Sequence, residues 1–157
     1  MSDELIYRID TATVSEIEEH LRQADEDFIP PLSGRVDISA YASKLAAKAA
    51  RFEAWASGRL VGLIAVYCND PASETAYVSS VSVSKEWMGR GIASTLVSKC
   101  IEHVVHSRMR RIRLEVSLDN EPALRFYERH GFSLVAQEIR NATLELDLSG
   151  GEDRDGR

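Results

Sequence analysis

The stretch VSVSKEWMGRGIASTLV, residues 81–97, leads from an apolar alternation into an amphipathic helical pattern through a turn with two glycines. The first turn of a helix presents backbone amides without partners and a partial positive charge, and together these bind phosphate groups. Gly89 and Gly91 would let the backbone approach such a ligand closely, and Arg90 adds positive charge. The stretch therefore predicts a phosphate-binding loop, with a purely structural glycine turn as the alternative.

Two common phosphate-binding loops do not fit this stretch. A P-loop requires Lys and then Ser or Thr after its last glycine, whereas Gly91 is followed by Ile92 and Ala93. A Rossmann fingerprint requires its glycines directly after a strand, but residues 84–88 intervene here, and Ser94 stands where the third glycine would be. Both are disfavoured.

The strand expected just before the loop, TAYVSSVSV at residues 75–83, has an irregular alternation. Its apolar residues move from even positions (Ala76 and Val78) to odd positions (Val81 and Val83). Because a strand has a period of two, the slip at the central serines predicts one extra residue, a β-bulge, which leaves backbone groups unpaired. A flexible or edge strand diluted by serines is the alternative.

A second informative stretch, LEVSLDNEPALRFYERHGF, occupies residues 114–132 and predicts a strand followed by a helix that ends at a glycine. Together the two stretches resemble the GNAT acyltransferase superfamily, whose acetyl-CoA loop reads Gln/Arg-x-x-Gly-x-Gly/Ala and whose later block has Asn, Ala, Phe-Tyr and Gly-Phe. The later block is matched here by Asn120, Ala123, Phe126, Tyr127, Gly131 and Phe132. The Gln/Arg position of the loop is Met88, a departure that Arg90 could offset.

The order of predicted elements fits such a fold. The patterns predict strands at 5–9, 51–56, 59–68, 75–83, 111–118, 132–139 and 142–148, and helices at 13–28, 37–50, 91–109 and 120–130. The resemblance implies a GNAT-like α/β fold, an acyl-CoA N-acyltransferase fold with a mixed, mostly antiparallel central sheet and helices on both faces. We expect one domain at 1–148 and a disordered tail at 149–157.

The resemblance also implies a reaction, the transfer of an acetyl group from acetyl-CoA to a primary amine of a small molecule by direct attack. The phosphates would bind the loop, and the pantetheine arm would pair with Val81 and Val83 as an added strand would. A backbone amide freed by the bulge could polarise the thioester carbonyl. The loop residues expected to bind the cofactor are Met88, Gly89, Arg90, Gly91, Ile92, Ala93 and Ser94.

Two further residues receive roles from the resemblance. Tyr127 matches the general acid that protonates the departing thiolate, and its alternative is a core aromatic. Asn120 would bind pantetheine, cap a helix, or do both. No general base is assigned. The nearby carboxylates at positions 70, 74 and 115 are more often solvated or paired.

The acceptor pocket is expected between the first two helices, their loop and the strand ends. Arg35 ends the apolar loop FIPPLSGR and could pair with a carboxylate or phosphate of the acceptor. Tyr67 and Asn69 follow a predicted central strand and are the other candidate acceptor-binding residues. Turn chemistry and edge packing are the alternative for all three. An amino sugar, a small amine or an amino acid would fit such a pocket.

Composition excludes several other classes. The 157 residues carry a net charge of −6, which argues against nucleic acid and anionic membranes as partners. No stretch is long and apolar enough to span a bilayer, and two cysteines in apolar segments favour the cytoplasm. His103 and His106 have no third ligand nearby, so no metal site is expected.

Alternatives to the small-molecule activity remain at this stage. One is a CoA-binding or protein-interaction module without turnover, which the Met88 departure and the unassigned base favour. Another is an acetyltransferase of protein N-termini or lysines. A homodimer is possible, and the final hairpin, which carries Leu144, Leu146 and Leu148, is the segment expected to form its interface.

Overall fold

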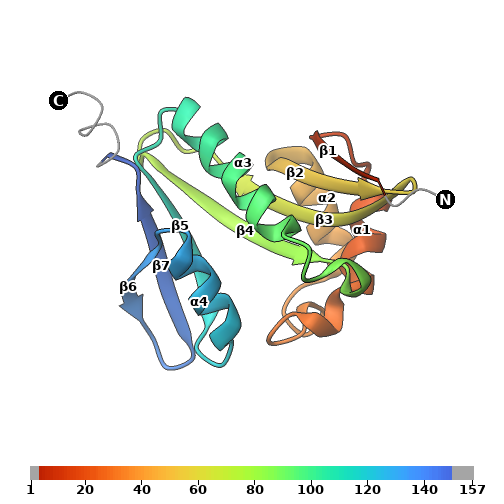
Figure 1. Ribbon diagram of the computed structural model, residues 1–157. Coiled ribbons are helices and arrows are strands. Elements are labelled where there is room, and N and C mark those ends of the chain that lie inside the picture. Colours follow the sequence, from red (N-terminus) through yellow and green to blue (C-terminus); the bar gives the residue numbers. More distant parts are fainter. Residues whose placement is uncertain (1–3, 150–157) are drawn as a thin grey trace.

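A seven-stranded sheet in the order β1-β2-β3-β4-β5-β7-β6 crosses the molecule (Figure 1). The computed structural model describes residues 4–149. Its strands are β1 (Leu5–Ile9), β2 (Ala50–Ala56), β3 (Arg59–Tyr67), β4 (Thr75–Val83), β5 (Arg111–Ser117), β6 (Ser133–Gln137) and β7 (Asn141–Asp147). Neighbouring strands are antiparallel except β4 and β5, which are parallel. The mixed, mostly antiparallel sheet expected from the sequence is confirmed.

Helices cover both faces of this sheet (Figure 1). On one face α1 (Val14–Gln23) and α2 (Ile38–Lys48) enclose one hydrophobic cluster, and on the other α3 (Ile92–His106) and α4 (Glu121–Arg129) enclose a second. Three short 3-10 helices, η1 (Asp25–Asp27), η2 (Leu32–Gly34) and η3 (Lys85–Trp87), lie in the connections. Among residues 4–149 no helix has the length and apolar character needed to cross a bilayer.

The first helix ends earlier than the sequence pattern predicts. The expected helix runs to residue 28, whereas α1 stops at Gln23 and the separate turn η1 follows. Three consecutive acidic residues, Asp25–Asp27, would oppose the negative end of the helix dipole if the helix continued. Of the expected tail at 149–157, only Ser149 falls within the described residues.

Local signals at the helix starts are confirmed. Thr13 and Glu16 form a capping box, with Glu16 N donating to Thr13 Oγ1 at 3.1 Å and Thr13 N donating to Glu16 Oε1 at 2.9 Å. Asp37 caps α2 by accepting a hydrogen bond from Ser39 N at 3.1 Å. These caps fix where the two helices of the first face begin.

The bulge expected in β4 is present. Ser80 pairs with Ala65 and Val78 pairs with Val66, so Ser79 is an extra residue without a partner on β3. The bulge restores the apolar alternation on the α3 side, because Val78 and Val81 both belong to the hydrophobic cluster there. The serines face the α1 and α2 side instead.

Next to the bulge, β4 and β5 separate. They pair only from Thr75 to Tyr77, with Arg111 to Arg113 as partners, and β5 then continues beside β7. Figure 1 shows the two strands diverging like the arms of a V. The remaining length of β4 therefore has no strand beside it on this edge within the described residues, and backbone groups are open to a ligand there.

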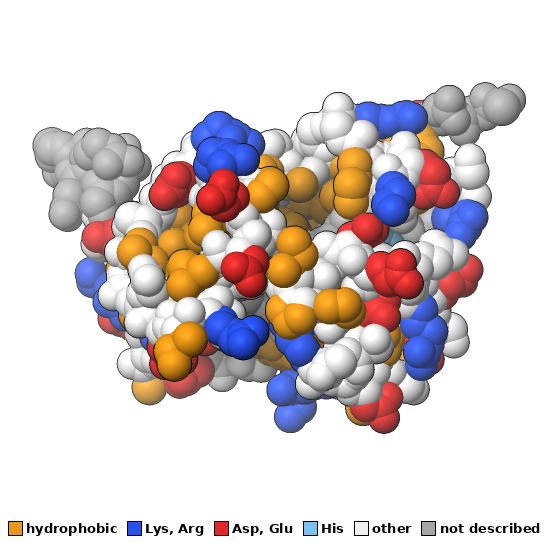
Figure 2. Space-filling view, turned by 90° about the horizontal axis from the view of Figure 1, so that it is seen from below, with side chains coloured by type: hydrophobic (Ala, Val, Ile, Leu, Met, Phe, Trp, Pro, Cys, Tyr) orange, Lys and Arg blue, Asp and Glu red, His pale blue; other side chains and the backbone are white. Residues whose placement is uncertain are grey.

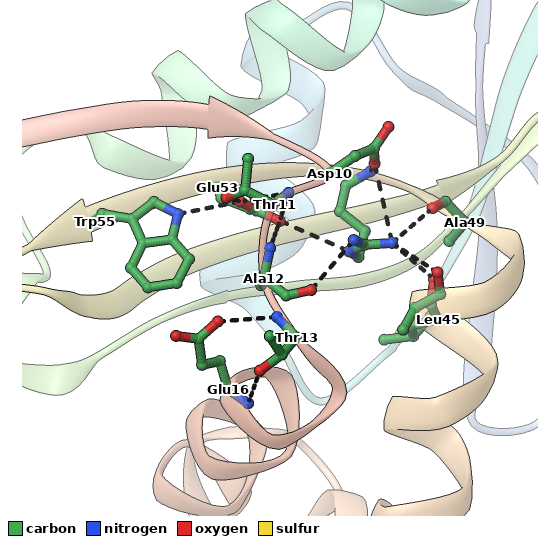
Figure 3. Close-up of polar contacts among 11 residues, drawn as sticks. Asp10, Thr11, Ala12, Thr13, Glu16, Leu45, Ala49, Glu53 and Trp55 are labelled. Carbon is green, nitrogen blue, oxygen red and sulfur yellow. Dashed lines mark hydrogen bonds and ion pairs between the residues drawn. The ribbon is translucent and has the colours of Figure 1, made fainter.

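A buried polar network fixes the α1 and α2 side (Figure 3). The Glu53 carboxylate is fully buried and accepts hydrogen bonds from Thr11 Oγ1 at 2.6 Å, Ala12 N at 2.9 Å and Trp55 Nε1 at 3.1 Å. Arg51 Nε lies 3.6 Å from the same carboxylate. The Arg51 guanidinium also donates to carbonyls at the end of α2, so the network joins β1, β2 and α2.

His20 ties α1 to the middle of the sheet. Its Nε2 lies 2.8 Å from Ser82 Oγ and its Nδ1 lies 3.2 Å from the Leu60 carbonyl oxygen. Burial lowers the pKa of His20 to about 4, so the ring is neutral near pH 7. A neutral ring can accept from the serine hydroxyl through Nε2 while Nδ1–H donates to the carbonyl.

The final hairpin places its leucines inward. Leu144 is buried, and Leu146 and Leu148 pack against the same cluster, whereas Leu134 and Val135 on β6 are about half exposed. An interface on this hairpin would therefore use β6 and not the three leucines named from the sequence. The homodimer itself stays a prediction.

Candidate active site

A cleft of about 670 Å³ lies between β4, the start of α3 and α4, and we call it the α3 cleft. Eight residues predicted to bind the cofactor line it: Val81, Val83, Met88, Gly89, Gly91, Ile92, Ala93 and Ser94. Strand β4 and the loop before α3, to which the resemblance assigns a shared cofactor, therefore line one cavity.

The start of α3 has the geometry of an anion site. Gly89 and Gly91 have φ values of 79° and 80°, in the left-handed region that favours glycine. Gly91 caps α3 without any side-chain hydrogen bond, and a Cβ at Gly89 or Gly91 would meet no atom within 4 Å. The space beside both glycines is therefore open, and the first-turn amides of α3 are the groups that an anion would bind there.

Arg90 stacks on an aromatic neighbour. Its guanidinium carbon lies 4.3 Å from the Trp87 ring centroid, and its Nη2 donates to the Glu86 carbonyl oxygen at 3.4 Å. Arg90 does not line the α3 cleft, whereas Trp87 does. Trp87 received no predicted role, although its position within residues 81–97, next to the predicted loop, could have indicated that it lines the cleft.

His130 also acquires a position that the sequence did not suggest. Its Nε2 lies 3.2 Å from Ser94 Oγ, and its ring centroid lies 4.7 Å from that of Phe126. Burial, and then the charge of Arg129, lower the pKa of His130. The contact ties the first turn of α3 to the end of α4 at the edge of the α3 cleft.

A second cleft, of about 530 Å³, lies on the other side of the gap between β4 and β5, and we call it the bulge cleft. Its walls are the loop after η1, Tyr41 of α2, the bulged part of β4 and the end of β5. Figure 2 views the end of the molecule at which the strands diverge, with hydrophobic side chains across the middle and charged groups of both signs around them.

The predicted acceptor residues divide between this cleft and the rest of the molecule. Arg35 lines the bulge cleft. Tyr67 and Asn69 line neither cleft. Lys44 Nζ lies 5.6 Å from the Tyr67 ring centroid, and Asn69 Nδ2 donates to the Lys48 carbonyl oxygen at 3.3 Å. Both residues therefore contact α2, because β3 ends beside it.

Asn120 lies in the bulge cleft and not in the α3 cleft. Its Oδ1 accepts a hydrogen bond from Ala123 N at 3.3 Å and so caps α4. The cap expected from the sequence is present, and the Asn120 amide also faces the cavity.

Hydroxyl groups gather at the bulge. Tyr41 OH donates to the Ser79 carbonyl oxygen at 3.0 Å and lies 2.6 Å from Ser79 Oγ. Ser80 is buried and lines the bulge cleft, and its Oγ makes no hydrogen bond. Polar groups are thus concentrated at the bulge of β4.

The two clefts meet at Tyr127. This residue lines both, together with Asp27, Phe28, Val81 and Ala123. Its ring packs edge-on against Phe126 and Phe132, with centroids 5.2 and 5.6 Å away. Burial, and then the neighbouring Cys100, raise the pKa of Tyr127 above that of an ordinary phenol. The hydroxyl therefore keeps its proton at neutral pH, which is the form that a general acid requires.

No activated thiol competes for this site. Burial raises the pKa of Cys100 to about 12 and raises that of Cys68 as well, so both remain protonated near pH 7. Within residues 4–149, no three His, Cys, Asp or Glu side chains gather where they could hold a metal ion.

Comparisons with known proteins find related sequences. The chain is 35% identical over 82 residues to N-alpha-acetyltransferase MAK3 of Arabidopsis thaliana, covering 52% of this chain and 43% of that protein. It is 38% identical over 73 residues to the L-amino acid N-acetyltransferase AaaT of Escherichia coli, covering 46% and 42%. The chain therefore spans less than half of either relative.

A solved structure supports the fold. The PaiA N-acetyltransferase of Thermoplasma acidophilum, in complex with coenzyme A, aligns with a TM-score of 0.69 and 16% identity over 90% of this chain and 99% of that one. Residues 14–132 match the acetyltransferase (GNAT) family over most of the chain, including both clefts' β4, α3, β5 and α4 walls. The chain belongs to the acetyltransferase (GNAT) family.

Proposed function

We propose that the protein transfers an acetyl group from acetyl-CoA to a primary amine of a small molecule. The observation that carries the proposal is the meeting of the two clefts at Tyr127. The diphosphate would bind the first-turn amides of α3, and the pantetheine arm would run along the open edge of β4 at Val81 and Val83. The thioester would then lie between Val81 and Tyr127.

Tyr127 is the residue that we propose as the proton donor on the acetyl-CoA side of the site. The amine nitrogen attacks the thioester carbon, the C–S bond breaks, and Tyr127 protonates the departing thiolate sulfur. Because Tyr127 stays protonated at neutral pH, the donor is always in the required form. Backbone amides freed by the bulge could stabilise the negative oxygen that forms on the carbonyl.

The attacking amine must also lose a proton, on the side of the bulge cleft. We propose that the Glu115 carboxylate takes up this proton. This residue stands on β5, lines the bulge cleft across from the bulge, and is exposed. Burial, and then the negative charge of Glu115, raise the pKa of Tyr77, and both residues line the same cleft as the bulged part of β4. Asp27 also lines the cleft, but Lys85 Nζ lies 3.8 Å from its carboxylate.

Release of CoA from acetyl-CoA is the direct test. Purified protein would be offered pools of amines, amino sugars, amino acids, polyamines and peptides, with CoA thiol measured against time. The proposal expects amine-dependent release with at least one small-molecule pool. Release only with peptides, or with none of the pools, would contradict it.

Replacing Gly91 with valine should weaken acetyl-CoA binding by at least about tenfold. A β-branched residue is strained at a φ of 80°, and its side chain would enter the open space that the diphosphate needs. Calorimetric titration with CoA measures the change. Gly58→Val, at a φ of 75° in the β2–β3 turn and outside both clefts, is the matched control and should bind CoA normally.

Replacing Glu115 with glutamine should lower kcat/KM for the amine by about 10- to 100-fold, at the low end for an acid–base group because water reaches this exposed side chain. The fall in activity that protonation of the base causes at low pH should also disappear. A pH–rate profile of both proteins measures this. Glu102→Gln, exposed on α3 and outside both clefts, should match the wild type, and an unchanged Glu115→Gln profile would remove the assignment.

A further inference from the structure

The bulge cleft holds a cation without an ionic partner. Arg35 lines the cleft, and within residues 4–149 no carboxylate lies within ion-pair distance of its guanidinium. Burial raises the pKa values of Tyr41 and Tyr77, and the Arg35 charge opposes both shifts. The guanidinium therefore shares the bulge cleft with both phenols and with the hydroxyl groups of the bulge.

The buried Ser80 hydroxyl lines the same cleft as Arg35. Ser80 is 5% exposed, and its Oγ is enclosed and makes no hydrogen bond of good geometry; its side chain still interacts with the Tyr41 phenol and lowers the pKa of that group against the larger effect of burial. An unpaired buried hydroxyl is costly, and native proteins rarely keep one without a reason. Because Ser80 lines the bulge cleft, a bound ligand could accept its hydrogen bond.

The opposite charge lies across the same cavity. Burial raises the pKa of Tyr77, Glu115 raises it further and Arg35 lowers it, and all three residues line the bulge cleft. The cleft is also lined by Asp27, Asp119 and Arg140, so a ligand bound there meets charged groups of both signs. A simple amine would pair only with the acidic groups and would leave the exposed Arg35 guanidinium to water.

We propose that the acceptor is a small primary amine that also carries a carboxylate, with the carboxylate held by Arg35 and Ser80 and the amine directed at Glu115 and the thioester. This inference rests on the proposed acetyltransferase function and names its substrate class. A guanidinium and a hydroxyl offer the charge-assisted hydrogen bonds that carboxylates accept. The N-terminus of a long peptide would bring an amide to this position instead.

Matched acceptors test the inference. The probes are L-alanine against ethylamine, L-phenylalanine against phenethylamine and L-histidine against histamine, each with the corresponding amino-acid amide, plus β-alanine and 4-aminobutanoate for spacing. Acetyl-CoA consumption is measured with each. In at least one pair the carboxylate-bearing acceptor should have a kcat/KM at least about tenfold above both its amide and its decarboxylated partner.

Two variants locate the selectivity. Arg35→Gln should raise KM for the preferred acceptor by about tenfold or more, change kcat little, and leave the decarboxylated amine nearly unaffected. Ser80→Ala should also raise that KM, while its Tm stays equal or rises because the buried hydroxyl has no partner in the free protein. Arg59→Gln, which removes the same charge at an exposed site outside both clefts, is the control.

The possible results distinguish a wrong substrate class from a wrong acetyltransferase function. Equal activity with carboxylates, amides and simple amines, or an Arg35→Gln effect that is the same for all of them, would overturn the substrate class and leave the acetyltransferase function standing. Preference for peptides whatever their terminal group would overturn the substrate class as well. If no amine releases CoA while CoA still binds, both proposals fail.

Discussion

Replacing Tyr127 with phenylalanine is expected to lower kcat by about 10²- to 10⁴-fold, the range that a positioned general acid supplies. The substitution keeps the ring that packs against Phe126 and Phe132 and removes only the proton donor. KM for acetyl-CoA should therefore change little. Steady-state kinetics with varied acetyl-CoA separates the two parameters.

The acid role has a second signature. A thiolate leaving group with a low pKa needs less help from an acid, so an activated acyl thioester should recover part of the lost rate in Tyr127→Phe. Tyr7→Phe is the matched control, since Tyr7 lies on β1 outside both clefts. A kcat for Tyr127→Phe that equals the wild-type value at every pH would exclude the residue as the acid.

Replacing Glu53 with alanine should destabilise the fold by about 3–5 kcal/mol, because it leaves the buried Arg51 guanidinium with only the more distant and half-exposed Asp10 carboxylate, 4.0 Å away. The donors on Thr11, Ala12 and Trp55 also lose their acceptor. Such a loss is a large share of the roughly 5–15 kcal/mol that stabilises a typical domain. Urea unfolding followed by circular dichroism measures it.

An exposed ion pair provides the comparison. Glu18 bonds Arg22 one turn away on α1, where both side chains are partly exposed, so Glu18→Ala should cost less than about 1 kcal/mol. If the two alanine variants unfold at the same urea concentration, the Glu53 network does not hold β1, β2 and α2 together as described.

Local signals in the sequence predicted much of the fold. The capping box at Thr13, the cap at Asp37 and the slipped alternation in β4 are each written within a few neighbouring residues, and each is present in the structure. The end of α1 is less local. It depends on the balance between a continuing apolar pattern and three acids at the helix end, and the apolar pattern alone predicted too long a helix.

The site was predictable only where one continuous stretch carries it. The loop from Met88 to Ser94 is such a stretch, and all of it except Arg90 lines the α3 cleft. The acceptor side is assembled from η2, α2, β4 and β5, which are distant in sequence. No periodicity could bring Tyr41 to Ser79 or turn Asn69 toward α2, because those contacts depend on how the helices pack across the sheet.

The separation of β4 and β5 illustrates the same limit. Both strands were expected, but nothing in their residues states that they pair only from Thr75 to Tyr77 and then diverge. That divergence creates the space in which the two clefts meet. Ser80 and Glu115 gain their proposed roles from it, since each faces the gap from a different strand.

The most direct test of the central claim is a crystal structure of the protein with a non-hydrolysable acetyl-CoA analogue. We expect the diphosphate on the amides of Ile92, Ala93 and Ser94, the pantetheine arm along Val81 and Val83, and the thioester carbonyl within reach of Tyr127. An analogue bound elsewhere, or an α3 cleft left empty at saturating concentration, would contradict it.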